Sequence, residues 1–249
     1  MAAPEEPLPG AHFRDRTGEH FTHTQWSMVL RAGDAGSADS QQALERLCRT
    51  YWPPIYGYLR RKGFSAADAE DHTQEFFAAL LRRGSIAAAD ATRGRFRTFL
   101  LSSLQNFLRD ARDKTTAAKR GGGHAVMALD CAEAERRYLE APSGELNPEQ
   151  LFDRRWAAAL LEAAVARMAE EHAAARKLAI FTRLRPFLTE QPTSGDYESA
   201  SVELGMKPNT IAATVRRLRL RCRELLREEL GQTAAGPDDA EQEFRTLFG

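Results

Sequence analysis

The chain has 249 residues, 43% of them hydrophobic, so it is long and apolar enough for one large or two small domains with real cores. Its 35 basic and 35 acidic residues cancel to a formal net charge of zero, which argues against an indiscriminate polyanion binder. Three widely spaced cysteines without a CxxC pair argue against a disulfide framework or a zinc site, and no apolar stretch approaches the ~20 residues of a membrane span. We therefore expect a protein of the reducing cytoplasm with no membrane partner.

The first part of the chain is expected to be a tail followed by an interrupted helix. Residues 1–20 mix prolines with charges of both signs and lack the apolar core of a signal peptide, which predicts a disordered tail. Apolar residues then recur at helical spacing through Leu44, Leu47 and Tyr51. We expect Pro53 and Pro54 to break or kink this run, because proline cannot donate a helical hydrogen bond.

The next predicted helix carries an acidic face. Ser65 followed by Asp68 is typical of a helix start, and Gly84 is expected to end the helix. The face consists of Asp68, Glu70, Asp71, Gln74 and Glu75, with His72 among them. A solvated face and a protein-docking face both fit this pattern. A metal-dependent enzyme that uses Asp71, His72 and Glu75 is a weaker alternative, because no matching pair of ligands appears elsewhere.

A basic and aromatic stretch follows. From Arg93 to Arg120 eight basic residues stand against two acidic ones, and arginines alternate with Phe96 and Phe99. Such interleaving can hold a nucleic-acid backbone and stack unpaired bases. Alternatively, the phenylalanines belong to the core of a helix from about 95 to 118 and the arginines to its solvated face. We expect at least one of the two phenylalanines to be buried.

Three consecutive glycines, 121–123, mark a domain boundary and open a looser stretch to about residue 146. Asn147, Pro148 and Gln150 then predict a new helix start, with Asn as the cap and Gln capping back. We expect helices over about 147–171 and 173–188, and a loop over 189–196. No segment predicts a strand.

Residues 197–230 predict a short helix, a turn and a long arginine-rich helix. Gly205 can take the positive φ that ends the first helix, and Pro208 suits the first turn of the next. One apolar stripe on the long helix predicts a core-facing side, and it consists of Ile211, Val215, Leu218, Cys222 and Leu225. The other faces are strongly basic, which indicates either a groove-reading helix of a helix-turn-helix or a solvated surface helix.

The order of these segments resembles the bacterial RNA polymerase sigma factors of the extracytoplasmic-function type. The phrases that carry the resemblance are DAEDHTQEFFAALLRR (68–83), RGRFRTFLLSSLQNFLRDARD (93–113), a linker and the C-terminal helix-turn-helix. The likeness covers most of residues 21–230. RGRFRTFLL, KRGGG, LFDRRWAAALLE and RPFLTE are similar to a long subgroup common in planctomycetes.

The resemblance implies an all-α fold of two helical domains. It assigns 21–120 to a region two domain, 121–146 to a linker, 147–230 to a region four domain with the helix-turn-helix, and 231–249 to an extension. It also implies a binding factor without catalytic residues, cofactor or metal. The expected partners are core RNA polymerase and promoter DNA, with an anti-sigma factor or other regulator left open. A stand-alone helix-turn-helix regulator of duplex DNA is the alternative.

Three sets of site residues follow from the resemblance. The set expected to bind core polymerase is Asp68, Asp71, Gln74, Glu75 and Phe76. The set expected to open and hold the minus-ten element is Arg93, Arg95, Arg97, Asn106, Arg109 and Arg112. The set expected to read the minus-thirty-five element is Lys207, Asn209, Thr210, Ala213, Arg216 and Arg217.

The chain departs from the family pattern at several places. Residues 121–171 are longer than in compact members, and Ser201 stands where a small apolar residue is common. Ala212 and Ala213 replace longer side chains, which predicts few base contacts. In the extension, Phe244, Leu247 and Phe248 predict a short amphipathic helix that either packs back or meets a partner.

Overall fold

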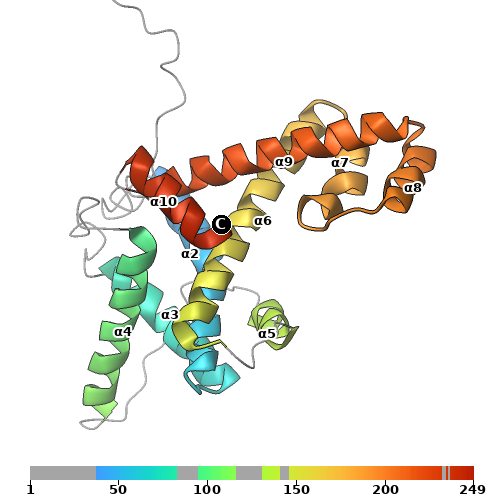
Figure 1. Cartoon of the computed structure of the whole chain (residues 1–249). Helices are drawn as coiled ribbons and strands as arrows, with labels where there is room; N and C mark the ends of the chain where they lie inside the picture. Colours follow the sequence, from blue (N-terminus) through green and yellow to red (C-terminus); the bar gives the residue numbers. More distant parts are fainter. Residues whose placement is uncertain (1–37, 83–94, 116–130, 141–145, 232–233, 235) are drawn as a thin grey trace, which may run out of the picture.

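The computed structural model describes residues 38–82, 95–115, 131–140, 146–231, 234 and 236–249 (Figure 1). All the regular elements in these ranges are helices and none is a strand, which confirms the all-α prediction. The elements are α2 (Ala38–Arg61), α3 (Ala66–Arg82), α4 (Phe96–Thr115), α5 (Cys131–Glu140), α6 (Pro148–Ala174), α7 (Leu178–Leu184), the 3₁₀ turn η2 (Arg185–Leu188), α8 (Ser194–Leu204), α9 (Pro208–Gly231) and α10 (Pro237–Phe248). No helix in these ranges has the length and apolarity needed to cross a bilayer.

Helix α2 continues through Pro53 and Pro54, so the predicted break is absent. A proline inside a helix costs about 3 kcal/mol, because it removes a hydrogen bond and crowds the preceding turn. Burial of a large apolar side chain contributes about 1.5–3 kcal/mol. Six such side chains around the prolines are buried: Tyr51, Trp52, Ile55, Tyr56, Tyr58 and Leu59. Their combined burial outweighs the cost of both prolines.

An aromatic cluster joins α2, α4 and α6. The Trp156 ring stacks on Tyr51, with centroids 4.1 Å apart and planes 17° apart. Phe96 from α4 lies 6.0 Å from the same tryptophan, and Phe152 lies 5.7 Å from it. Trp156 and Phe96 are each 1% exposed. The expectation that at least one phenylalanine of the basic stretch is buried is therefore confirmed.

Two predicted helix starts are confirmed in atomic detail. At α3, the Asp68 N–H donates to Ser65 Oγ at 3.1 Å. At α6, the Gln150 N–H donates to Asn147 Oδ1 at 2.8 Å, and the Asn147 N–H donates to Gln150 Oε1 at 3.0 Å. This reciprocal pair is a complete capping box. Short-range side-chain chemistry thus sets where these helices begin.

Helix α6 is shared between the two ends of the molecule. Its first half packs along α2, and its second half packs along α9. Phe152 and Trp156 lie in the α2 contact, while Arg167 pairs with Glu228 and Glu229 of α9. The predicted division into domains at 121–146 stays a prediction, because α6 spans both units.

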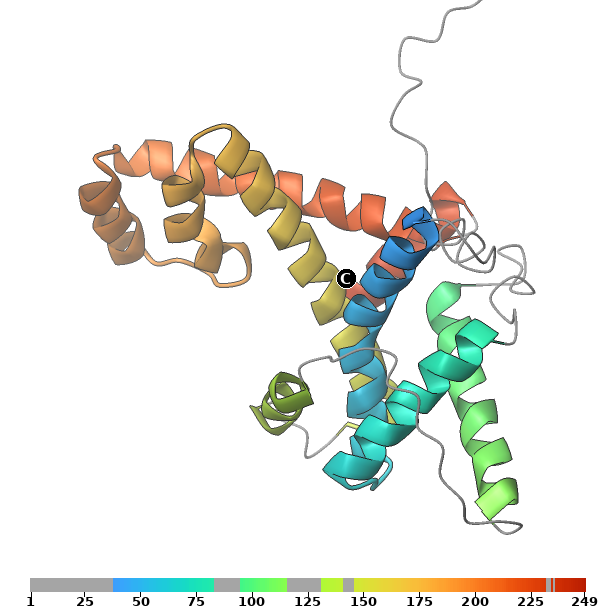
Figure 2. The same ribbon diagram turned by 180° about the vertical axis from the view of Figure 1, so that it is seen from behind.

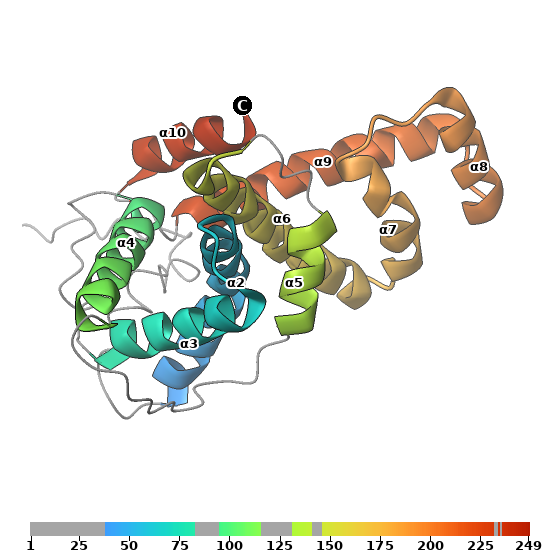
Figure 3. The same cartoon turned by 90° about the horizontal axis from the view of Figure 1, so that it is seen from below.

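The predicted linker contains a helix, α5, that the sequence did not indicate. Its Glu135 accepts two hydrogen bonds from Arg60 of α2, at 2.9 and 2.8 Å, and a third from the Tyr56 hydroxyl at 2.6 Å. The hydrogen bond from Arg60 lowers the pKa of Glu135, although burial opposes the shift. Arg137 also pairs with Glu162 of α6 at 2.8 Å. Helix α5 is therefore held beside α2 and α6 (Figure 3).

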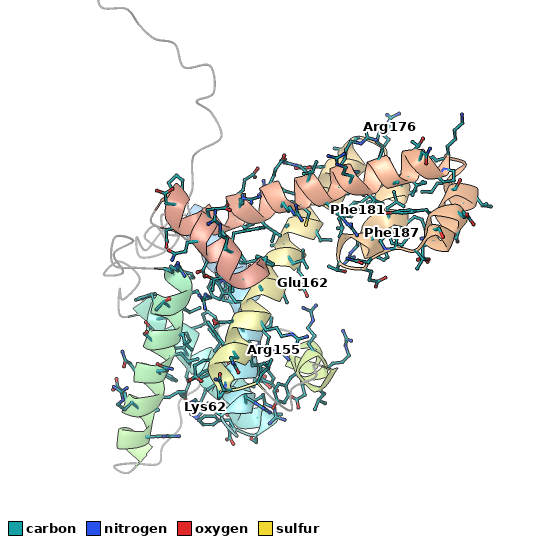
Figure 4. All side chains as sticks on the ribbon, in the orientation of Figure 1. Lys62, Arg155, Glu162, Arg176, Phe181 and Phe187 are labelled. Carbon is teal, nitrogen blue, oxygen red and sulfur yellow. The ribbon has the colours of Figure 1, made fainter. Side chains whose placement is uncertain are left out.

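Helices α7 and α8 and the first half of α9 form a tip that projects away from α2, α3 and α4 (Figures 1 and 2). Phe181 and Phe187 supply its buried rings and lie below α9 in Figure 4. Phe181 stacks on His172, and Phe187 meets Tyr197 of α8 edge-on. The five residues of the predicted apolar stripe on α9 are all buried, which confirms that stripe.

The C-terminal extension packs back on the molecule. Helix α10 contacts α9 and α6, and its Ala240 is buried. Phe244, Leu247 and Phe248 pack partly buried against the core. The amphipathic helix expected in this segment is therefore present, and within the described chain its apolar face lies against the protein's own core.

Gly57 of α2 lies against the Arg155 side chain of α6, and Gly57→Ala is expected to destabilise the fold. An added Cβ would lie 2.5 Å from Cδ and 2.6 Å from Nε of Arg155. Arg155 has little room to move, because it is 8% exposed and donates to the Arg137 carbonyl. Overpacking of this kind costs about 1–3 kcal/mol. Thermal denaturation should show a midpoint lower by about 2–4 °C per kcal/mol.

The control for this prediction is a double-mutant cycle with Arg155→Ala. If the steric contact is the cause, Gly57→Ala should cost much less once the arginine side chain has been removed. Strictly additive effects of the two substitutions would contradict the explanation.

Candidate nucleic-acid interface

The acidic face of α3 is presented to solvent. Asp68, Asp71 and Glu75 are exposed, while Gln74 is half-buried and donates to Glu70 Oε1 at 3.4 Å. The opposite side of the helix is anchored by Ala69 and by three further buried residues, which are Thr73, Phe77 and Leu80. Since the core fixes one side of α3, its carboxylates form a rigid exposed row.

Phe76 does not belong to that exposed row. It is 2% exposed, and its ring lies 5.7 Å from Phe77 and 5.7 Å from Phe107 of α4. Of the five residues predicted to bind a partner, Phe76 is therefore the one that packs α3 against α4. A side chain with this burial supports the docking face from beneath.

His72 lies between aromatic rings. Its ring meets Phe64 edge-on at 5.0 Å and Phe107 at 6.4 Å, and its Nδ1 is 3.7 Å from Glu75 Oε2. Across the described parts of the chain, no group of three or more His, Cys, Asp or Glu side chains gathers as metal ligands would. The pair at His72 and Glu75 thus has no third ligand from another described element.

The minus-ten set divides into two groups on α4. Asn106, Arg109 and Arg112 are exposed in the second half of the helix, on a side away from the buried Leu100 and Leu104. Arg109 donates to Asn106 Oδ1 at 3.4 Å. Spacing of three residues keeps these polar groups along one broad face. This group can meet a backbone phosphate without any rearrangement of the helix.

Arg95 and Arg97, at the start of α4, form the second group and are already paired. Arg95 contacts Asp239 Oδ1 at 3.0 Å and Glu243 Oε2 at 2.7 Å. Arg97 donates to Glu243 Oε1 at 2.6 Å and to Oε2 at 3.3 Å, and also pairs with Asp153. Burial tends to lower the pKa of Arg97, but these carboxylates raise it above its usual value. Arg93 lies outside the described residues.

The turn between α8 and α9 has the geometry expected from its sequence. Gly205 has φ of 63°, a left-handed conformation that ends α8, and Pro208 opens α9. All six residues predicted to read DNA here are exposed: Lys207, Asn209, Thr210, Ala213, Arg216 and Arg217. They lie on the side opposite the buried stripe of α9, so this surface is free of the protein's own core.

Three further arginines of α9 have structural partners. Arg219 donates to the carbonyls of Phe187 and Glu190, at 2.9 and 2.8 Å, and thus caps the end of η2. Arg221 pairs with Glu171 of α6 at 2.6 Å, and Arg227 pairs with Glu241 of α10 at 2.8 Å. The exposed basic residues predicted to read DNA therefore lie at the start of α9 and on the outer face of its first half.

The helices α2, α3 and α4 are similar to a known protein family. Residues 47–117, which span most of α2 and all of α3 and α4, match the family model described as Sigma-70 region 2. This part of the chain is similar to a sigma-70 region 2 domain. This domain supports a sigma factor involved in RNA polymerase binding and promoter recognition, and its family comprises transcription initiation factors rather than enzymes. No curated protein and no solved structure matches the chain.

Two functional features of this region were not apparent from the sequence. The first is the α5 contact on α2, for which no local pattern gave a signal. The second is the pairing of Arg95 and Arg97 with α10, whose only trace in the sequence was the presence of four acidic residues and a single basic one after Gly231. Both depend on contacts between segments distant in the chain.

Proposed function

We propose that this protein is a sigma factor of the extracytoplasmic-function type, in a long planctomycete-like subgroup, that directs promoter recognition, DNA opening and transcription initiation. The observation that carries the proposal is the Sigma-70 region 2 match over 47–117. That match coincides with the helices that present an exposed acidic row and an exposed basic face. The protein acts in the cytoplasm, where its polymerase partner works.

The acidic row of α3 is the proposed contact with core polymerase. Asp68, Asp71 and Glu75 offer carboxylates at the surface, and Gln74 lies beside them. Buried Phe76 holds the helix against α4, so the row is positioned before the partner arrives. A preorganised row lowers the ordering cost of binding.

The two exposed basic faces are the proposed DNA contacts. Asn106, Arg109 and Arg112 of α4 would hold the nontemplate strand of the minus-ten element. The turn and first half of α9 would enter the major groove at the minus-thirty-five element, where Asn209 can pair with adenine in two places. The proposed region two domain is 21–120 and the proposed region four domain is 147–230. Helix α6, at the start of the second domain, packs on α2 of the first and so connects the two. The proposal also allows for a further partner, an anti-sigma factor or other regulator.

The proposal is tested by a pull-down with core polymerase. Asp71→Ala combined with Glu75→Ala should weaken association by about tenfold or more, because two charge-assisted contacts are lost. Circular dichroism should show an intact fold, since both side chains are exposed. The matched control is Glu170→Ala, which removes an exposed carboxylate from α6 and should leave association unchanged. Wild-type association by the double variant would count against α3 as the docking helix.

Transcription in vitro separates a sigma factor from a stand-alone regulator. Core polymerase on genomic DNA should produce new transcripts only when the protein is present, and their ends locate the promoter. Specific binding of duplex DNA by the protein alone, without any effect on core polymerase, would favour the regulator.

A further inference from the structure

The acidic helix α10 covers the basic start of α4. Three of its contacts reach across from the extension: Asp239 to Arg95, Glu243 to Arg95, and Glu243 to Arg97. The Glu243 side chain is 5% exposed, and that of Arg97 is 12% exposed. These groups therefore form a closed ion-pair cluster. Figure 1 shows that α10 lies at the upper end of α4.

The geometry of this cluster is that of an arginine bound to an oxyanion. Arg97 uses Nε and Nη2 to bind both oxygens of Glu243. The same paired donors of a guanidinium bind two oxygens of a phosphate. A carboxylate of α10 and a DNA phosphate would thus compete for the same atoms of Arg97.

We propose that α10 is an internal anion that blocks Arg95 and Arg97 in the free protein and is displaced by the phosphates of promoter DNA. This inference rests on the proposed function, because it assigns a regulation to the region that would hold the minus-ten strand. In the free protein, the residues of the minus-ten set that α4 exposes to a DNA strand are Asn106, Arg109 and Arg112, on the polar face of its second half. Displacement of α10 extends that face to the start of the helix.

The way α10 is held makes it displaceable. Besides the cluster with α4, it is attached by the pair between Arg227 and Glu241 and by the Arg227 guanidinium over the Phe244 ring, at 4.3 Å. Ala240 is its one fully buried apolar residue among those described. Apolar contacts of the partly buried Phe244, Leu247 and Phe248 complete the attachment. Its electrostatic part, which includes every contact with α4 named above, is weakened by a polyanion and by salt. A helix of 12 residues is also marginal in isolation, so release favours unfolding of α10.

The first experiment measures DNA binding without polymerase. The probe is a fluorescein-labelled single strand of mixed sequence, and the variant combines Asp239→Asn with Glu243→Gln. Both changes keep side-chain shape and remove the charges that face α4. We expect about tenfold tighter binding, the gain of one charge-assisted hydrogen bond. The log–log salt dependence should become steeper by about 0.7 for each additional phosphate contacted.

The matched control is Asp238→Asn, which removes one negative charge from an exposed position of the same helix. It reports the general effect of net charge and should leave the salt slope unchanged. If the double variant binds no more tightly than Asp238→Asn, the proposal is overturned. Adding Arg95→Ala and Arg97→Ala to the double variant should remove the gain, and persistence of the gain would also overturn it.

A second experiment uses the wild-type chain and does not depend on how any variant folds. Amide hydrogen exchange of residues 237–249 is followed with and without saturating single-stranded DNA. Exchange should accelerate in α10 when DNA is bound, because the helix loses its packing. Unchanged or slower exchange in α10 would overturn the proposal.

The polymerase pull-down distinguishes failure of this inference from failure of the proposed function. Normal core association together with DNA binding that does not respond to Asp239→Asn and Glu243→Gln would overturn the role of α10 alone. Absence of core association in the wild type would overturn the proposed function, and the comparison of DNA affinities would still decide whether α10 blocks an anion site.

Discussion

Trp156→Ala is expected to lower the free energy of unfolding by about 3–5 kcal/mol, the usual cost of truncating a buried large aromatic residue. Trp156 stacks on Tyr51 and also meets Phe96 and Phe152, so it touches α2, α4 and its own helix α6. Its loss would open a cavity where these three helices join. Natural domains are stable by only about 5–15 kcal/mol, so this loss is a large part of the total free energy of unfolding.

Thermal and urea denaturation followed by circular dichroism check this prediction. The matched control is Trp156→Phe, which keeps an aromatic ring in the stack. The Trp156 indole N–H has no acceptor among the described residues, so phenylalanine loses volume but no hydrogen bond. Trp156→Phe should therefore be much milder. A denaturation midpoint for Trp156→Ala within about 2 °C of the wild type would show that α6 does not depend on this cluster.

Arg216→Ala combined with Arg217→Ala is expected to weaken promoter binding by the complex with core polymerase by about tenfold to a hundredfold. Each side chain is exposed on the outer face of α9, where a hydrogen bond to phosphate contributes about 1.5–3 kcal/mol. Binding releases fewer counterions from the DNA when two phosphate contacts are lost, so the log–log salt slope should also fall by about 1.8 in total. The measurement is affinity at several salt concentrations on the mapped promoter.

Arg154→Ala serves as the control, since it removes an exposed arginine from the first half of α6, away from the tip. It should alter neither the affinity nor the slope at the minus-thirty-five element. The two variants should share wild-type stability, because neither Arg216 nor Arg217 packs in the core. A double variant with an unaltered salt slope would remove both arginines from the DNA interface.

Most helices of this protein could be predicted because their determinants are local. The side-chain cap at Ser65, the capping box at Asn147, the left-handed Gly205 and the apolar stripe of α9 depend on residues a few positions apart. Helix caps, turn residues and apolar periodicity therefore predicted the positions of these helices to within a few residues. The predicted break at Pro53 and Pro54 is absent, because burial of the flanking aromatic residues outweighs the local preference of proline.

The candidate site was predictable in residue type more than in placement. The exposed acids of α3 and the exposed residues of α9 lie where the pattern of polar positions indicated. Phe76 was placed among the residues that bind core polymerase, and its ring lies in the core, where it fills the contact between α3 and α4. Arg95 and Arg97 were expected to face a nucleic acid and instead bind carboxylates of the chain itself.

By itself, the sequence determined the helical class, most helix boundaries and the order of an acidic helix, a basic helix and a helical pair with a tight turn. Local hydrogen bonding and the 3.6-residue period suffice for these features. Only the tertiary structure decided that α5 docks on α2 through Glu135, that α6 is shared between both ends, and that α10 covers Arg95 and Arg97. The Arg97 contact with Glu243 joins residues 146 positions apart, and no local periodicity specifies which distant charges meet. Their pairing depends on how the intervening helices pack.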